Sequence, residues 1–231
     1  MNYLFHISVF SPLIPILFFV LFKFNSKQRA KWVIFLLLVI SLITDIWCYN
    51  LARNNIKTTW IINIFSVIEF AFLSYFFTLI ISLKKQQIFI WLCYAGFLLY
   101  WLVQNIFVES IEIFDYQSQA IEFLLLLICC LLYLFQRVKN VRGEILYNTY
   151  QFWIVAALLM YCAGTFFGFL SSVSPEERDF DTIVYEYLSR GGNILKHILI
   201  TIAFCINPAN QKNEHPNKNS IYYIKDNLGK D

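Results

Sequence analysis

Apolar stretches of about 20 residues recur along this chain, and they limit its possible folds more than any other feature of the sequence. A helix that crosses the hydrocarbon core of a bilayer needs about 20 mostly apolar residues. Hydrophobic residues make up 59% of the 231 positions and charged residues 14%, whereas a soluble domain carries about 25% charged residues. The sequence therefore predicts an all-α, polytopic membrane protein.

Seven segments are long and apolar enough to be spans, which predicts a seven-transmembrane-helix bundle. They cover residues 3–23, 30–50, 58–82, 87–107, 117–136, 149–172 and 182–206. The first segment has no basic residues before it and no small-residue cleavage site, so we expect it to be retained as a span. We expect one transmembrane domain, 1–206, followed by a short basic tail, 207–231, that is disordered because it is rich in Asn and Lys.

Lysine and arginine are distributed unequally between alternate loops. The first, third and fifth loops and the tail together hold thirteen of them, whereas the other loops hold three, Arg53, Lys57 and Arg178. Because basic residues close to spans remain on the cytoplasmic side during insertion, we expect the N-terminus outside and the C-terminus in the cytoplasm. The expected location is the bacterial inner (plasma) membrane.

Ionisable residues inside spans are costly in lipid and are therefore candidates for function. In the last segment, Glu186, Arg190, Asn193 and His197 fall within about 60° of one another on a helical wheel and form one polar stripe. Glu186 and Arg190 are four residues apart, so they can pair on the helix itself. We expect this stripe to face protein or water and not lipid.

Three other segments each carry one carboxylate, namely Asp45, Glu69 and Glu122, with Ser66 on the same side as Glu69. An isolated carboxylate at such a depth must be protonated or paired. Two interpretations remain open. The polar residues line a pocket that opens outward, with Glu69 and His197 at its floor, or they form interhelical hydrogen bonds that only fix the packing.

Glycines mark two further positions. Gly164 and Gly168 form a G-x-x-x-G pair that allows another helix to approach closely, either within the chain or in a homodimer. Gly191 and Gly192 lie next to Arg190, where they indicate either a kink or unwound turn, or plain close packing. The six cysteines all lie within or at the ends of apolar segments, and we interpret them as small apolar side chains.

Three segments resemble an uncharacterised family of short bacterial seven-span integral membrane proteins. They are S-L-I-T-D-I, N-I-F-S-V-I-E-F and G-G-N-I-L-K-H-I-L-I-T-I-A-F, in the second, third and seventh spans. Proteins of this kind are sensor-like, so the resemblance implies the sensor half of a signalling system, whose kinase or regulator is a separate chain.

The predicted topology and Lys196 in the last span also resemble the retinal-binding microbial rhodopsins, but in topology only. The third span lacks that family's D-W pattern and offers only Glu69, so retinal on Lys196 is not expected. A comparison with the zinc-dependent alkaline ceramidases is limited by the supply of imidazoles, because of His6, His197 and His215 only His197 lies deep in a span. Zinc on Asp45, Glu69 and His197 is therefore not expected, and no cofactor is predicted.

The leading hypothesis is a receptor-like sensor with an outward-facing polar pocket for a small or amphipathic ligand and a separate kinase or regulator at the cytoplasmic face. The alternatives are a small transporter or proton-coupled carrier that uses Glu69 and His197 as a relay, an intramembrane lipid hydrolase, and a structural subunit of a membrane complex. No residues are assigned as catalytic, and no nucleic-acid partner is expected.

Overall fold

The computed structural model describes residues 3–22, 28–108, 116–139, 146–171 and 178–206, and it describes no side chains at 107–108, 116, 146, 167–171 and 178–186. Within these ranges the regular structure is entirely helical. Five helices are long and apolar enough to cross a membrane: Tyr3–Leu21, Arg29–Arg53, Thr59–Ile80, Lys84–Ile106 and Gln117–Lys139. The prediction of an all-helical membrane protein is therefore confirmed at this level, while the predicted tail, 207–231, lies outside the described residues.

The helices lie close to the predicted segments. They are α1 (Tyr3–Phe10), α2 (Leu13–Leu21), α3 (Arg29–Arg53), α4 (Thr59–Ile80), α5 (Lys84–Val103), the π-helical turn η1 (Gln104–Val108), α6 (Tyr116–Lys139), the short 3₁₀ turn η2 (Leu146–Asn148), α7 (Tyr150–Ser171) and α8 (Arg178–Cys205).

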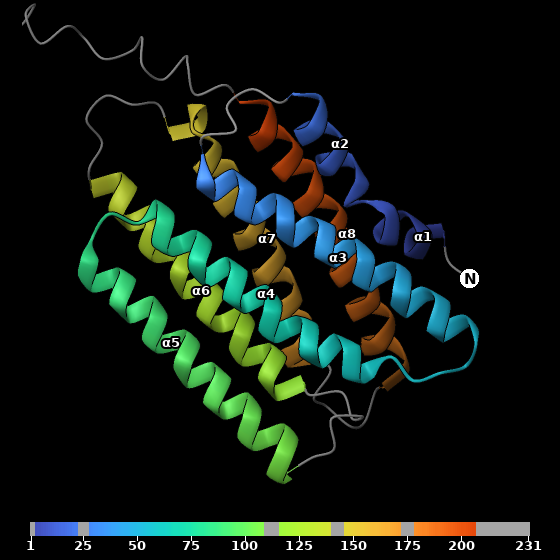
Figure 1. Ribbon diagram of the computed structural model, residues 1–231. Helices are drawn as coiled ribbons and strands as arrows, with labels where there is room; N and C mark the ends of the chain where they lie inside the picture. The colour runs from blue at the N-terminus through green and yellow to red at the C-terminus, as the bar shows by residue number, and fades with distance from the viewer. Residues whose placement is uncertain (1–2, 23–27, 109–115, 140–145, 172–177, 207–231) are drawn as a thin grey trace, which may run out of the picture.

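The first segment differs from the continuous helix that the sequence predicts, because it breaks between α1 and α2. Pro12 has no backbone N–H, so it cannot make the helical hydrogen bond to the carbonyl of Ser8. The hydroxyl of Ser11 donates to that carbonyl instead, over 2.6 Å. The chain changes direction at this point, and Ser8 and Ser11 are both buried (Figure 1).

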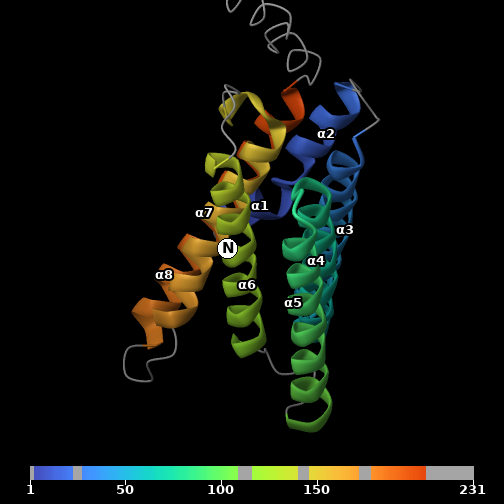
Figure 2. The same cartoon turned by 90° about the vertical axis from the view of Figure 1, so that its left-hand side faces the viewer.

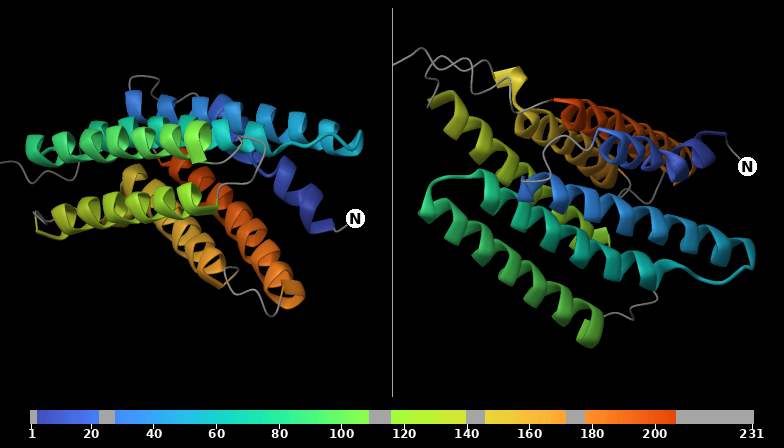
Figure 3. Two further views of the ribbon diagram at one scale, coloured as in Figure 1. Left: turned by 90° about the horizontal axis from the view of Figure 1, so that it is seen from below. Right: turned by 45° about the horizontal axis from the view of Figure 1, so that its top comes forward.

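The long helices form two layers. Figure 3 shows α3, α4 and α5 side by side in one layer and α6, α7 and α8 in the other. In Figure 2, α6 lies between the first layer and α7. α6 contacts both α4 and α7, and α1 and α2 both pack on α8. The first and last helices of the described chain are therefore neighbours in space.

Apolar side chains fill the space between the layers. Phe70, Phe77 and Leu126 are almost fully buried, whereas large side chains such as Ile43 and Leu92 point outward, with 59% and 66% of their surface exposed. Lipid is as apolar as these side chains, so helix association depends on close packing and on polar contacts between helices. The buried polar residues of the bundle are therefore the informative ones.

One such contact closes the end of the bundle where α8 finishes. The ammonium of Lys31, near the start of α3, donates to the backbone carbonyl of Ile206 over 3.0 Å and lies 4.8 Å from the centre of the Tyr150 ring. The last carbonyls of a helix have no partner within the helix, and a cation stabilises them. Lys31 therefore connects α3, α7 and the end of α8.

Candidate functional site

A cavity of about 350 Å³ lies between α1, α3, α4, α6 and α7. Three carboxylates line it, and each comes from a different helix: Asp45 from α3, Glu69 from α4 and Glu122 from α6. Ala52 and Thr58 are also in the lining, so the cavity reaches the connection between α3 and α4. The structure thus brings three of the predicted pocket residues together around one space.

Aromatic side chains form much of the rest of this lining, which gives the cavity apolar walls around its acidic groups. They are Phe5, Tyr49, Phe65, Phe123 and Tyr161. Ligand pockets are usually apolar with a few placed polar groups, and their volumes are about 300–1,000 Å³. This cavity has the composition and the size of a small-molecule site.

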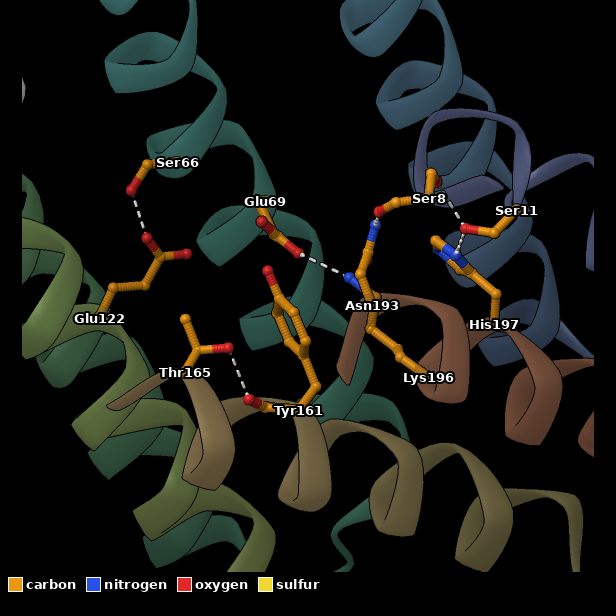
Figure 4. A network of polar contacts seen from close by, with 10 residues as sticks. All are labelled: Ser8, Ser11, Ser66, Glu69, Glu122, Tyr161, Thr165, Asn193, Lys196 and His197. Atoms are coloured by element: carbon orange, nitrogen blue, oxygen red, sulfur yellow. Dashed lines mark hydrogen bonds and ion pairs between the residues drawn. The ribbon is translucent and has the colours of Figure 1, made fainter. Parts of the chain in front are cut away.

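Glu122 is the most deeply buried of the three acids, with 2% of its surface exposed. The hydroxyl of Ser66 on α4 donates a short hydrogen bond to its Oε2 atom. Its Oε1 atom is buried and has no hydrogen-bond partner among the residues that the structure describes. In Figure 4 this oxygen points away from Ser66, toward the side on which Glu69 and Tyr161 lie. One acceptor at the cavity wall is therefore unsatisfied.

Glu69 has a cationic partner that the sequence analysis did not assign to it. The Nζ atom of Lys196 on α8 lies 3.8 Å from Oε1 of Glu69 and 3.9 Å from the centre of the Tyr161 ring on α7 (Figure 4). An ammonium over an aromatic face is attracted by the ring quadrupole. The cavity is thereby connected to α8 through one buried cation.

The predicted polar stripe of α8 faces the N-terminal helices. Asn193 donates to the hydroxyl of Ser8 over 3.3 Å, and Nδ1 of His197 lies 2.7 Å from the hydroxyl of Ser11. The guanidinium of Arg190 lies 4.5 Å from the centre of the Phe5 ring. None of these three α8 residues lines the large cavity, so they hold α1 against α8. The side chain of Glu186 lies outside the described residues.

The hydrogen bonds of Ser11 determine which nitrogen of the His197 ring carries the hydrogen. The Ser11 hydroxyl has one hydrogen, and the carbonyl of Ser8 can only accept, so this hydrogen points to Ser8. Nδ1 of His197 must then donate to the Ser11 oxygen. A neutral His197 consequently carries an acceptor at Nε2, which is buried and has no partner among the described residues.

A second, smaller cavity of about 20 Å³ lies next to the first, on the other side of Glu69. Its lining includes Ser41, Glu69, Lys196 and His197, together with apolar residues of α3, α4, α7 and α8. About 10–15 Å³ is enough for one water molecule if polar partners surround it. Glu69 lines both cavities and thus separates the aromatic-walled space from the groups of α8.

Three of the four glycines have room for a side chain among the described residues. A Cβ atom at Gly164 or Gly191 would meet no atom within 4 Å, and one at Gly192 would meet Tyr161 at an ordinary 3.6 Å. α8 also continues through both of its glycines, so the unwound turn that the sequence left open is not formed. The backbone at Gly168 is helical, but its surroundings lie outside the described residues.

Three polar residues that contribute to this arrangement were not predicted from the sequence: Ser8, Ser11 and Tyr161. A signal for the first two was present, because a Ser-Pro pair inside a span indicates a helix break whose freed carbonyl needs a polar partner. Tyr161 had no such signal, since a tyrosine in an apolar helix is indistinguishable from a core side chain.

Comparisons with known proteins return no match, either to a family model, to a curated protein or to a solved structure. Among the described residues, no group of three His, Cys, Asp or Glu side chains is arranged to hold a metal ion.

Proposed function

We propose that this chain is a receptor-like sensor of a bacterial inner membrane, in which the carboxylate-lined cavity binds a small or amphipathic ligand and α8 transmits its occupancy to a separate cytoplasmic kinase or regulator. The observation that carries the proposal is the ion pair between Glu69 in the cavity wall and Lys196 on α8. Glu69 lines the cavity and lies 3.8 Å from Lys196, so a ligand that contacts Glu69 changes the surroundings of a charge on α8.

In this proposal the bundle has seven spans, with α1 and α2 together forming the first and α7 and α8 the last two. The N-terminus is outside and the C-terminus is in the cytoplasm, as the thirteen basic residues on one side and three on the other favour. The cavity reaches Ala52 and Thr58, and Lys31 and Ile206 meet at the other end of the bundle. The ligand would thus enter from outside, and α8 would end at the cytoplasmic surface.

The topology is tested by fusion of the full chain, after Asp231, to a fluorescent protein that matures in the cytoplasm and, separately, to a reporter that is active only outside. We expect fluorescence from the first fusion and no activity from the second. The reverse result would place the cavity entrance on the cytoplasmic side and remove the basis for an external ligand.

Ligand binding is tested by filling the cavity. Thr44 lines it, whereas the neighbouring Ile43 points outward with 59% of its surface exposed. We expect Thr44→Phe to remove small molecules that co-purify with the wild-type protein and Ile43→Phe to retain them, at equal membrane abundance. Ligand occupancy should also change hydrogen exchange at the last turn of α8. Equal recovery of small molecules from both variants would contradict the proposal.

A proton-coupled carrier is the second candidate, because the small cavity brings Glu69, Lys196 and His197 together next to the ligand cavity. Buried ionisable residues in such a series are typical of proton pathways. In proteoliposomes that contain a pH-sensitive dye, a carrier would show proton flux that is lost in Glu69→Gln. A sensor would show no flux in either protein.

A further inference from the structure

We propose that the ligand of the large cavity is an organic ammonium ion that carries an aromatic or aliphatic group. This inference rests on the proposed function, because it assigns a chemical class to the ligand of the same cavity. Four observations support it: the balance of charge around the cavity, the unsatisfied oxygen of Glu122, the aromatic walls and the position of the Lys196 ammonium group.

The charges around the cavity are unequal. Asp45, Glu69 and Glu122 line it. Among the described residues, Lys196 pairs with Glu69, and the guanidinium of Arg190 lies 4.5 Å from the centre of the Phe5 ring in the cavity wall. When the three acids are ionised, their negative charge exceeds the positive charge of these two cations. An isolated charge in a low-dielectric interior is costly, and an opposite charge within a few ångströms offsets that cost. A ligand with a positive charge is therefore favoured over a neutral or anionic one.

The second observation is the unsatisfied oxygen of Glu122. This residue is 2% exposed, its Oε2 atom accepts from Ser66, and its Oε1 atom has no partner in the described part of the chain. A buried acceptor without a donor costs about 1–3 kcal/mol. An ammonium N–H supplies both a donor and the complementary charge, so it satisfies this oxygen more completely than a hydroxyl does.

Lys196 shows how this site already binds an ammonium group. Its Nζ atom contacts a carboxylate on one side, at 3.8 Å, and the face of an aromatic ring on the other, at 3.9 Å. The cavity repeats this combination on a larger scale, with Asp45 and Glu122 among the rings of Phe5, Tyr49 and Phe123. Carboxylates combined with aromatic faces are the chemistry by which proteins recognise organic cations.

The size and the walls of the cavity argue against a bare metal ion. A volume of about 350 Å³ far exceeds the space that an ion and its ligands occupy, and no metal-holding group was found among the described residues. The apolar rings need an apolar partner. A charged amine attached to a hydrocarbon group matches both parts of the lining.

The test uses the full chain in lipid nanodiscs, with three probes of one shape and different charge: benzylamine, which is protonated at neutral pH, benzyl alcohol and benzoate. Binding is measured by isothermal titration calorimetry, with empty nanodiscs as the baseline for partition into lipid. We expect benzylamine to bind about tenfold or more tightly than either other probe.

Variants of cavity residues test whether benzylamine binds in this cavity. Glu122→Gln and Asp45→Asn should each weaken benzylamine binding about tenfold, and Thr44→Phe should abolish it. Lys84→Gln is the matched control, because it removes an exposed charge at the start of α5 and should leave the affinity unchanged. Two different carboxylate variants are included so that a folding defect in one leaves the other informative.

The outcomes separate this inference from the proposed function. Equal binding of benzyl alcohol or benzoate, abolished by Thr44→Phe, would overturn the ammonium assignment and retain a ligand cavity. Benzylamine binding that is insensitive to Thr44→Phe would place the amine elsewhere and overturn the inference. Absence of benzylamine binding at millimolar concentration would overturn it too. If Thr44→Phe loses the co-purifying ligand but the charge of the probe has no effect on binding, the sensor proposal is retained and the ammonium assignment is overturned.

Discussion

The ammonium of Lys196 lies 3.8 Å from the carboxylate of Glu69 and 3.9 Å from the centre of the Tyr161 ring, so one cation joins α8 to α4 and α7. The pair is largely shielded from solvent, with 10% of the Lys196 side chain and 15% of the Glu69 side chain exposed. Removal of one member of such a pair leaves the other as an uncompensated buried charge.

We therefore predict that Lys196→Met lowers the free energy of unfolding by about 3 kcal/mol. The double variant Lys196→Met with Glu69→Gln should recover at least half of this loss, because it removes both charges. The measurement is thermal unfolding of the detergent-solubilised protein. A double variant that is no more stable than Lys196→Met would show that the ion pair of Glu69 and Lys196 does not stabilise the fold.

The Ser11 hydroxyl bonds both to the Ser8 carbonyl and to His197, so Ser11→Ala should have two effects. It leaves the buried Nδ1 of His197 without its partner, while the Ser8 carbonyl keeps the backbone N–H of residue 11 at 3.3 Å, and this should cost about 1–3 kcal/mol. It should also change the nitrogen chemical shifts of the His197 ring, because Nδ1 loses its acceptor. Ser82→Ala is the control for the ring shifts, because it removes the acceptor of the Gln136 side chain on α6 and leaves the contacts of His197 intact. Unchanged His197 shifts in Ser11→Ala would contradict the inferred hydrogen position.

Lys31 is buried and donates to the carbonyl of Ile206, so Lys31→Met should loosen the end of α8 without changing the cavity. We expect faster backbone hydrogen exchange over residues 203–206, measured by mass spectrometry, and unchanged binding of benzylamine. Lys84→Gln, which removes an exposed cation, should leave exchange in this segment as in the wild-type protein. Slower or equal exchange in Lys31→Met would show that the contact does not hold the helix end.

The glycines of α8 should tolerate a side chain. A Cβ at Gly191 meets nothing within 4 Å and one at Gly192 meets Tyr161 at 3.6 Å. Alanine has the higher helix propensity, so Gly191→Ala should stabilise the protein by up to about 1 kcal/mol, and Gly192→Ala should be neutral or mildly stabilising. A loss of stability in thermal unfolding of Gly191→Ala would indicate a packing role that the structure does not contain.

The sequence predicted the helices well because apolar length is a local property. Asp45, Ser66, Glu69 and Glu122 are polar positions that the sequence picks out in three segments, and all four line the cavity. That they meet around one space follows from the arrangement of the helices, which no local pattern contains. Lys196 illustrates the same limit, since its partners Glu69 and Tyr161 come from other helices.

The polar face that a helical wheel predicts for α8 does not indicate which surface it contacts. Arg190 and Asn193 contact α1, and His197 contacts Ser11 in the break that follows it. The continuous first helix that the sequence predicted offered no reason for this segment to be polar there. The break at Pro12 provides that reason. One proline therefore changes both the path of the first segment and the role of the last helix.

The contacts from Ser8 to Asn193 and from Ser11 to His197 join residues 185 and 186 positions apart. During synthesis, α1 and α2 therefore enter the bilayer long before the helix that satisfies their polar groups exists. Until α8 is inserted, Ser8 and Ser11 have no partner from this helix. The contacts that hold the Ser-Pro break in place can therefore form only after the last helix of the bundle has been made.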